Sequence, residues 1–266
     1  MREASKVSRS DIVRSHCRAF VGNKPGLAMR VYMDESNTHD GTEWLTVAAA
    51  WADEDTWASW KTDWTKAIDP LQVYHSVDVS NRTGACAGWT KQFRDEVVFR
   101  AMDVIKKHQI HGRIALINRS WLKLALSHRS DVIAWLGHDY YVAFIWAANR
   151  SLEIMKDEGH SRISFFHEEN DFELLANIHF RRLTAAVGLP FATLTFGAKG
   201  AFEPLQCADI FAYEGMRQLK KGEVSKPLAR MDDYSNRVQF LNVTEDQTRK
   251  LASMMIDLFD EVTTGK

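Results

Sequence analysis

The second half of the chain alternates short apolar segments with longer stretches of helical periodicity. Residues 162–167 and 191–196 are short runs of β-branched and aromatic residues, each followed by a segment with apolar residues at helical spacing. Strands that alternate with helices along a chain are joined by crossover helices, which makes the strands parallel. This alternation predicts an α/β domain with helices covering the faces of a sheet.

The opening of the domain has a different pattern. An apolar run at 27–34 is followed by a polar turn and a second apolar run at 44–51. Two such runs around a turn rich in Ser, Asn, Asp and Gly are typical of an antiparallel hairpin. With a further strand at 113–118, we predict a mixed five-stranded sheet within residues 27–266, preceded by an N-terminal arm at residues 1–26.

The intervening residues predict helices. Helical patterns at 53–107 indicate an insertion after the second strand, in which Trp57, Trp60 and Trp64 share one face. Such a row of rings indicates core packing, with base stacking as the functional alternative. The longest helix is predicted at 132–156, and residues 222–243 are expected to be irregular.

Composition excludes several classes of protein. The chain has 266 residues, of which 45% are hydrophobic and 26% charged, as in a globular protein rather than a disordered one. A net charge of −1 gives no overall sign of nucleic-acid binding. The three cysteines lie far apart without a CxxC pair, which argues against a disulfide framework or a thiolate zinc site. Since no apolar run reaches the length of a membrane span or a signal peptide, we expect a cytoplasmic protein.

Acidic residues follow or interrupt three apolar segments. Asp34 ends the first strand, Glu168 and Glu169 end the strand at 162–167, and Asp209 lies among apolar and small residues of a late helix. A buried acid is costly without a partner, and carboxylate oxygens are ligands that Mg²⁺ prefers. Each acid taken singly also fits a structural role, as a turn former or a partner of a backbone amide. Together they predict a metal site, provided that the carboxylates converge within about 5–6 Å.

Two further features accompany these acids. On the late helix, Gln206, Asp209 and Tyr213 share one face at i, i+3 and i+7. His75, with Asp78 three residues later, is a candidate proton carrier near neutral pH, or else a hydrogen-bonded structural histidine.

The acids and their order carry a resemblance. Acid in the first strand, at the end of the fourth and on a late helix resembles the ribonuclease H-like fold. More closely, MDES at 33–36, the Tyr74-His75 pair and LQCADIFAYE at 205–214 are similar to the domain of unknown function 3800 family, over about residues 28–218. The resemblance implies a ribonuclease H-like nuclease or phosphotransferase scaffold with a helical insertion. Its acidic positions would match Asp34, either Glu168 or Glu169, and Asp209, and we favour Glu168 because it lies nearer the strand.

These observations lead to a functional hypothesis. We predict a divalent-metal-dependent nuclease in which Asp34, Glu168 and Asp209, with Glu169 as the further candidate ligand, hold Mg²⁺ or Mn²⁺ against a nucleic-acid phosphodiester, with His75 as the candidate proton carrier. The alternative is a catalytically inactive ribonuclease H-like module that binds nucleic acid or protein, and a third possibility is a hydrolase of a small phosphorylated substrate. The basic residues that could meet phosphates form no continuous stripe: Arg82, Lys91, Arg94, Arg119 and Lys199.

Overall fold

The structure is a computed structural model. It describes residues 28–264 apart from 39–40, 232–236 and 242–243. The predicted N-terminal arm, residues 1–26, lies outside the described residues. Within the described ranges, no helix combines the length and the apolar character that crossing a membrane requires.

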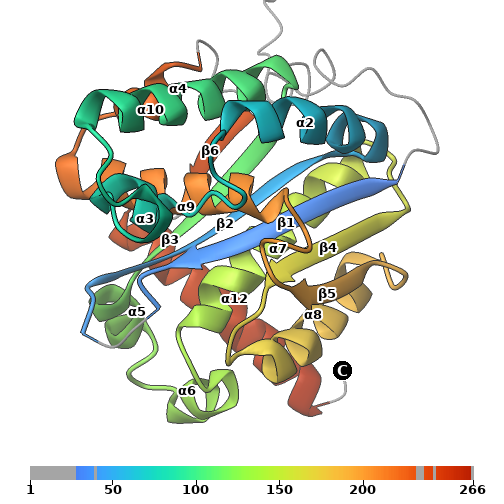
Figure 1. The fold of residues 1–266 in the computed structure, drawn as a ribbon. Helices are drawn as coiled ribbons and strands as arrows, with labels where there is room; N and C mark the ends of the chain where they lie inside the picture. Colours follow the sequence, from blue (N-terminus) through green and yellow to red (C-terminus); the bar gives the residue numbers. More distant parts are fainter. Residues whose placement is uncertain (1–27, 39–40, 232–236, 242–243, 265–266) are drawn as a thin grey trace, which may run out of the picture.

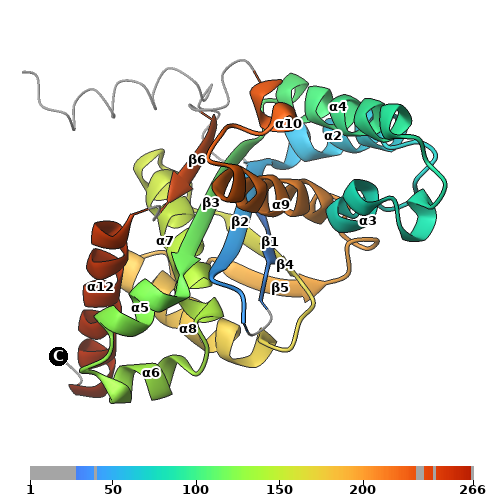
Figure 2. The same cartoon turned by 90° about the vertical axis from the view of Figure 1, so that its left-hand side faces the viewer.

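A mixed sheet forms the centre of the molecule, with the strand order β5-β4-β1-β2-β3-β6 (Figures 1 and 2). β1 (Met29–Ser36) and β2 (Trp44–Asp53) form the predicted antiparallel hairpin, and β3 (His111–Asn118) pairs antiparallel with β2. On the other side of β1, β4 (Ile163–Glu168) and β5 (Thr193–Gly197) continue the sheet in parallel. The prediction of an α/β domain with a mixed sheet is confirmed.

The sheet has a sixth strand, so the prediction of five is wrong. β6 (Val238–Leu241) pairs in parallel with β3 at the far edge. This strand and α10 (Lys226–Ala229) lie within 222–243, which was expected to be irregular. With only four residues, β6 is too short to show a period along the chain, and its backbone pairing with β3 is what makes it a strand.

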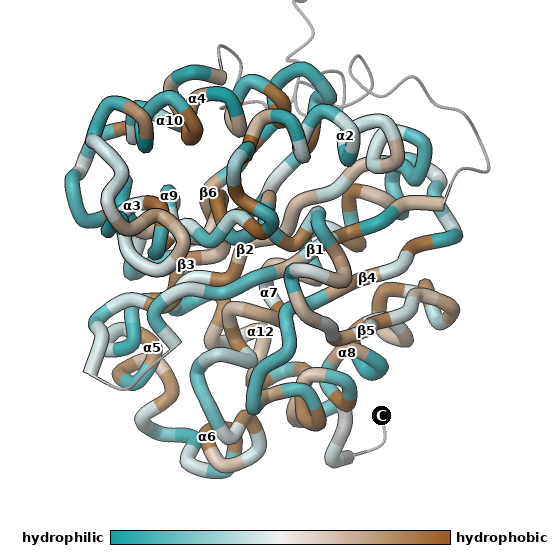
Figure 3. Tube along the Cα trace, in the orientation of Figure 1, coloured by the Kyte–Doolittle hydropathy of each residue, from teal (hydrophilic) through white to brown (hydrophobic). Residues whose placement is uncertain are grey.

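One face of the sheet is covered by α2 (Glu54–Ala67), α4 (Lys91–Lys107) and α9 (Leu205–Lys221). The predicted helical insertion therefore lies over this face, together with the short α3 (Ser76–Asn81) and a 3₁₀ turn (Gly84–Cys86). Figure 3 shows hydrophilic residues along much of the outer helix α4, whereas hydrophobic stretches run through β2 and β6.

The tryptophan row of α2 belongs to the core, as predicted. Trp57, Trp60 and Trp64 are all buried, and the rings of Trp60 and Trp64 stack with centroids 4.6 Å apart. Asp53 begins the helix, because its side chain accepts a hydrogen bond from the backbone N–H of Thr56 at 2.7 Å. These rings are therefore not available for base stacking.

The opposite face is covered by α7 (Tyr140–Asp157), α8 (Glu173–Val187) and α12 (Glu245–Thr264), with α5 (Arg119–Ala125) and α6 (Ser130–Leu136) beside them. The single helix predicted at 132–156 is wrong, because the chain forms α6 and α7 there. Gly137 ends α6 with a φ of +75°, a conformation that glycine adopts without steric cost. The helices together place the sheet between two apolar layers.

His179 on α8 makes the stability of this layer depend on pH. Its ring is buried against Trp135 and Tyr141, and neither ring nitrogen has a hydrogen-bond partner in the described part of the chain. Burial, with a smaller contribution from the charge of Arg182, lowers the pKa of His179 to about 4. The unfolded chain, with a histidine pKa of about 6.5, therefore binds a proton between pH 6.5 and 4 that the folded protein excludes.

The free energy of unfolding should accordingly fall as the pH decreases from 6.5 to 4.5. In His179→Phe, which keeps a ring but cannot titrate, this loss should be smaller by about 2–3 kcal/mol. Urea unfolding at pH 7 and pH 4.5 measures the difference. His128→Phe is the matched control, because His128 is exposed. Equal pH dependence in wild type and His179→Phe would contradict the assignment.

Candidate functional site

The parallel strands bring the predicted acids to one edge of the sheet. Met33 on β1 is paired with His167 on β4, and Glu168 is paired with Gly197 on β5. Asp34 is the next residue after Met33, so it lies level with Glu168. Because ligands of α/β sheets bind beyond the carboxyl ends of parallel strands, this edge is the expected position of a site.

Strand alternation selects which side chains share the site. Tyr32 packs in the core beneath α2 and α9, whereas Met33 packs in the core beneath α7. Asp34 therefore points to the α9 side, and Glu35 points to the α7 side. Asp209 lies in the second turn of α9, the helix that packs on this face of β1, so it approaches Asp34 from above the sheet.

The carboxylates converge on the ammonium group of Lys199, in the loop between β5 and α9. Lys199 Nζ lies 2.9 Å from Asp34 Oδ2 and 2.9 Å from Glu168 Oε2. A third contact of 3.2 Å joins it to Asp209 Oδ1. Because all three carboxylate oxygens contact the same nitrogen atom, they lie within about 6 Å of one another. We call these four residues the Lys199 cluster.

Most of the Lys199 cluster is buried. The side chains of Asp34, Lys199 and Asp209 are 1%, 7% and 8% exposed, whereas that of Glu168 is 29% exposed. Burial raises the pKa of Asp34 well above its usual range; Lys199 opposes this effect, while Asp209 and Glu168 add to it. The three carboxylates raise the pKa of Lys199 against the effect of burial, so its ammonium group remains charged.

Glu168 responds in the opposite direction. Burial alone would raise its pKa, but a hydrogen bond with Asp34 and the charge of Lys199 lower it, with a small contribution from His75. Asp34 is therefore the carboxyl group that retains a proton more strongly, and Glu168 is the more readily ionised of the two.

The predicted polar face of α9 is used to hold the segment that follows α2. Gln206 Oε1 accepts a hydrogen bond from the backbone N–H of Tyr74 at 2.7 Å, and Asp209 Oδ2 accepts one from Ser76 at 2.6 Å. Tyr213, one turn further along α9, donates its hydroxyl proton to Ser80 Oγ in α3. Asp209 thus uses one oxygen to anchor this segment and the other to contact Lys199.

Two other predicted residues lie outside the Lys199 cluster. Glu169 is exposed, and its backbone N–H donates to the carbonyl of Gly197 at 3.3 Å, whereas the neighbouring Glu168 makes the contact with Lys199. His75 is half-exposed, with its Nδ1 3.3 Å from Asp78 Oδ2. It lies one residue before Ser76, and its effect on the cluster is the small electrostatic contribution to the pKa of Glu168.

A second polar group lies on the opposite side of the same edge. Glu35 accepts a hydrogen bond from Asn170 Nδ2 at 3.1 Å, and its Oε2 lies 3.6 Å from His167 Nε2. His167 Nε2 is also 2.9 Å from the hydroxyl of Tyr140. Burial raises the pKa of Glu35 to about 7, with the hydrogen bond from Asn170 acting against it. Strand alternation predicts from the sequence that Glu35 and Asp34 point to opposite faces of the sheet. No sequence pattern indicates the hydrogen-bond and ion-pair partners of Glu35.

The position of Lys199 bears directly on metal binding. Within the described ranges, no group of three or more His, Cys, Asp and Glu side chains has the arrangement of a metal site. The ammonium group instead lies where the carboxylates meet. The sequence places Lys199 near this edge but not among the acids. The signal that could have located it is electrostatic, because acids embedded after apolar strands require a cation.

Comparison with known proteins gives no assignment. No protein-family model matches the chain, and a search of the curated proteins finds no match either. Function is therefore inferred from the chain's own residues and their geometry.

Removing the Lys199 ammonium group should destabilise the protein. Lys199→Met leaves three carboxylates around an apolar side chain, and we expect the free energy of unfolding at pH 7 to fall by about 3 kcal/mol. This value is at the lower end for a broken buried ion pair, because protonation of one carboxyl relieves part of the repulsion. Chemical denaturation measures the loss.

Lys61→Met is the matched control. Lys61 forms an ion pair with Glu203, but the two side chains are 59% and 30% exposed, so its loss should cost less than about 1 kcal/mol. Similar losses in the two variants would show that the cluster does not depend on the charge of Lys199.

Proposed function

We propose that this protein is a divalent-metal-dependent phosphodiesterase acting on nucleic acid, on a ribonuclease H-like scaffold. The observation that carries the proposal is the convergence of Asp34, Glu168 and Asp209 on one cation. The resemblance of MDES and LQCADIFAYE to the domain of unknown function 3800 family supports it, since Asp34 and Asp209 lie within these two motifs.

The residues fit a hard divalent ion in donor type and in charge. Three carboxylates from two strand ends and a helix supply only oxygen, as Mg²⁺ or Mn²⁺ prefers. Asp34 Oδ2 is buried, and it contacts the Lys199 ammonium group at 2.9 Å. A cation at this point would replace one positive charge with two, and Lys199 would have to move from its present position.

Asp34, Glu168 and Asp209 would hold the ion, with Glu168 nearest to solvent. A bound Mg²⁺ or Mn²⁺ supplies Lewis-acid polarisation of a phosphoryl oxygen and activation of water. Lys199, displaced from the carboxylates, would be available to neutralise a substrate phosphate. His75, half-exposed at the rim, would be the candidate proton carrier.

The same ammonium group favours a second candidate function. Lys199 already balances part of the charge of the carboxylates without a metal, and such a partly balanced cluster suits a catalytically inactive module that binds nucleic acid or protein. The two functions differ in whether Mn²⁺ binds and depends on Asp34.

The nuclease proposal is tested with Asp34→Asn. This variant keeps the side-chain shape but removes a charged ligand, so cleavage of nucleic acid with Mg²⁺ or Mn²⁺ should slow by at least about 100-fold, the effect of losing ~3 kcal/mol of transition-state stabilisation. Single-turnover cleavage of labelled single- and double-stranded substrates measures the rate. Asp257→Asn, an equal change at an exposed position of α12, should leave the rate unchanged.

Calorimetric titration with Mn²⁺ separates the two candidates. A nuclease should bind Mn²⁺ at or below millimolar concentration, and Asp34→Asn should weaken this binding. Cleavage at the wild-type rate by Asp34→Asn would refute the assignment. Absence of both cleavage and Mn²⁺ binding would favour the inactive module.

A further inference from the structure

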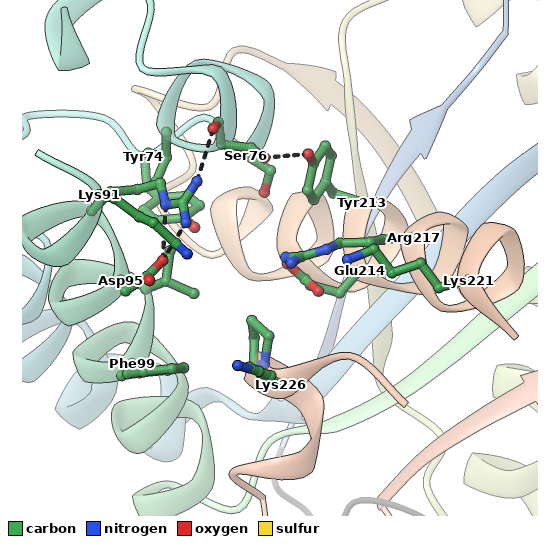
Figure 4. Close-up of a pocket in the computed structure, with 15 residues that line it drawn as sticks. Tyr74, Ser76, Lys91, Asp95, Phe99, Tyr213, Glu214, Arg217, Lys221 and Lys226 are labelled. Carbon is green, nitrogen blue, oxygen red and sulfur yellow. Dashed lines mark hydrogen bonds and ion pairs between the residues drawn. The ribbon is translucent and has the colours of Figure 1, made fainter. Parts of the chain in front are cut away.

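A basic pocket of about 240 Å³ lies beside α9, further along the helix than the Lys199 cluster. We call it the α9 pocket (Figure 4). Side chains enter it from α4, α9 and α10 and from the segment around α3. Five of its lining residues are cationic: Lys91, Arg94, Arg217, Lys221 and Lys226.

The two arginines are balanced by acids of the same pocket. Arg94 lies 2.5 Å from Asp95, and Arg217 lies 3.2 Å from Glu214. Arg94 is held further by its contact with the carbonyl of Ser80 at 3.3 Å. Each pair holds its guanidinium group in position. Because each pair joins one positive and one negative charge, the two arginines add no net positive charge to the pocket.

The three lysines give the pocket its positive charge. Lys91, Lys221 and Lys226 are exposed, and within the described part of the chain none of them forms an ion pair. In Figure 4 the amino groups of Lys91 and Lys226 point into the same space as the guanidinium group of Arg217. Since these residues come from three helices, the fold gathers charges that are scattered along the sequence. An anion with several negative charges is the ligand that suits this arrangement.

The pocket also offers a buried hydroxyl group and apolar surface. Ser76 lines it, and Ser76 Oγ is buried without a hydrogen-bond partner among the described residues. A buried hydroxyl group without a partner is costly, so a bound acceptor would stabilise it. Phe99 and Pro227 add apolar wall, against which a sugar or a base can pack.

Ser76 joins the α9 pocket to the Lys199 cluster. Its side chain lines the pocket, while its backbone N–H donates to Asp209 at 2.6 Å. Asp209 and Arg217 lie on the same helix, eight residues apart, which is about 12 Å along the axis. A strand with a rise of about 3.4 Å per nucleotide covers this distance in three or four nucleotides.

We propose that the α9 pocket binds backbone phosphates of a nucleic-acid strand whose scissile phosphodiester lies at the Lys199 cluster. The proposal rests on the proposed function for its polymer substrate. Lys91, Lys221 and Lys226 contact the phosphates, Ser76 Oγ donates to a phosphate oxygen, and the apolar wall receives a sugar or base.

The test is a binding measurement that needs no cleavage. Fluorescence anisotropy with labelled single-stranded DNA and RNA of about 12 nucleotides in EDTA gives the dissociation constant at several salt concentrations. Lys91→Gln/Lys226→Gln should bind at least about tenfold more weakly at low salt. Because each lost phosphate contact lowers the slope of log K against log salt by about 0.7 for a single strand, the slope should decrease by about 1.4.

Lys66→Gln/Lys123→Gln is the matched control, since it removes two exposed lysines on α2 and α5 that form no ion pair among the described residues. It should keep the wild-type affinity and slope. Ser76→Ala should weaken binding without changing the slope, because it removes a neutral donor.

The pocket assignment fails if wild type does not bind the oligonucleotides, if both lysine double variants bind equally well, or if polyglutamate of equal charge competes as effectively as the unlabelled oligonucleotide. Binding in EDTA that depends on Lys91 and Lys226, without any metal-dependent cleavage, would support the pocket and refute the nuclease. Cleavage that depends on Asp34 but not on these lysines would support the nuclease and refute the pocket.

Discussion

The contact of one ammonium group with three carboxylates is the interaction on which this edge of the molecule depends. Asp34 is almost fully buried, and a buried carboxylate without a partner would be strongly unfavourable. Lys199 supplies the missing charge and, in doing so, links β1, β4, the loop after β5 and α9 at one point. Three acids around a single lysine retain an excess of negative charge, so the cluster is tolerant of a second cation or of a proton.

The sheet makes this contact possible. Strands β1, β4 and β5 run parallel and end together, which delivers Asp34, Glu168 and the loop carrying Lys199 to one place. Alternation along β1 then points Asp34 and Glu35 to opposite faces of the sheet. The Lys199 cluster and the polar group around Glu35 therefore lie on opposite faces at the same edge. The group around Glu35 and His167 is built from hydrogen bonds rather than from ion pairs with lysine.

Sequence patterns identified what depends on local periodicity and missed what depends on pairing at a distance. The hairpin, the tryptophan row of α2 and helix α8 follow from the spacing of apolar residues and from the residues that begin or end helices and strands. All three lie where the sequence predicts them. The strand β6 and the break at Gly137 were missed, because four residues show no period and a helical pattern can continue across one glycine. Asp34, Glu168 and Asp209 stand out in the sequence because each acid contradicts its apolar surroundings, and the structure brings them together around Lys199. Lys199 was not placed among them, since nothing local fixes where a long side chain ends.

Helix α9 fixes the distance between two regions of the molecule. The backbone N–H groups of Tyr74 and Ser76 donate to side chains of α9 and so tie the segment that follows α2 to the core. The same helix carries Asp209 near one end and Lys221 at the other. A helix has a fixed rise, so the separation between its two ends does not vary with the loops around it. A ligand that contacts both ends of α9 must therefore span a fixed distance. This distance sets the minimum length of the ligand.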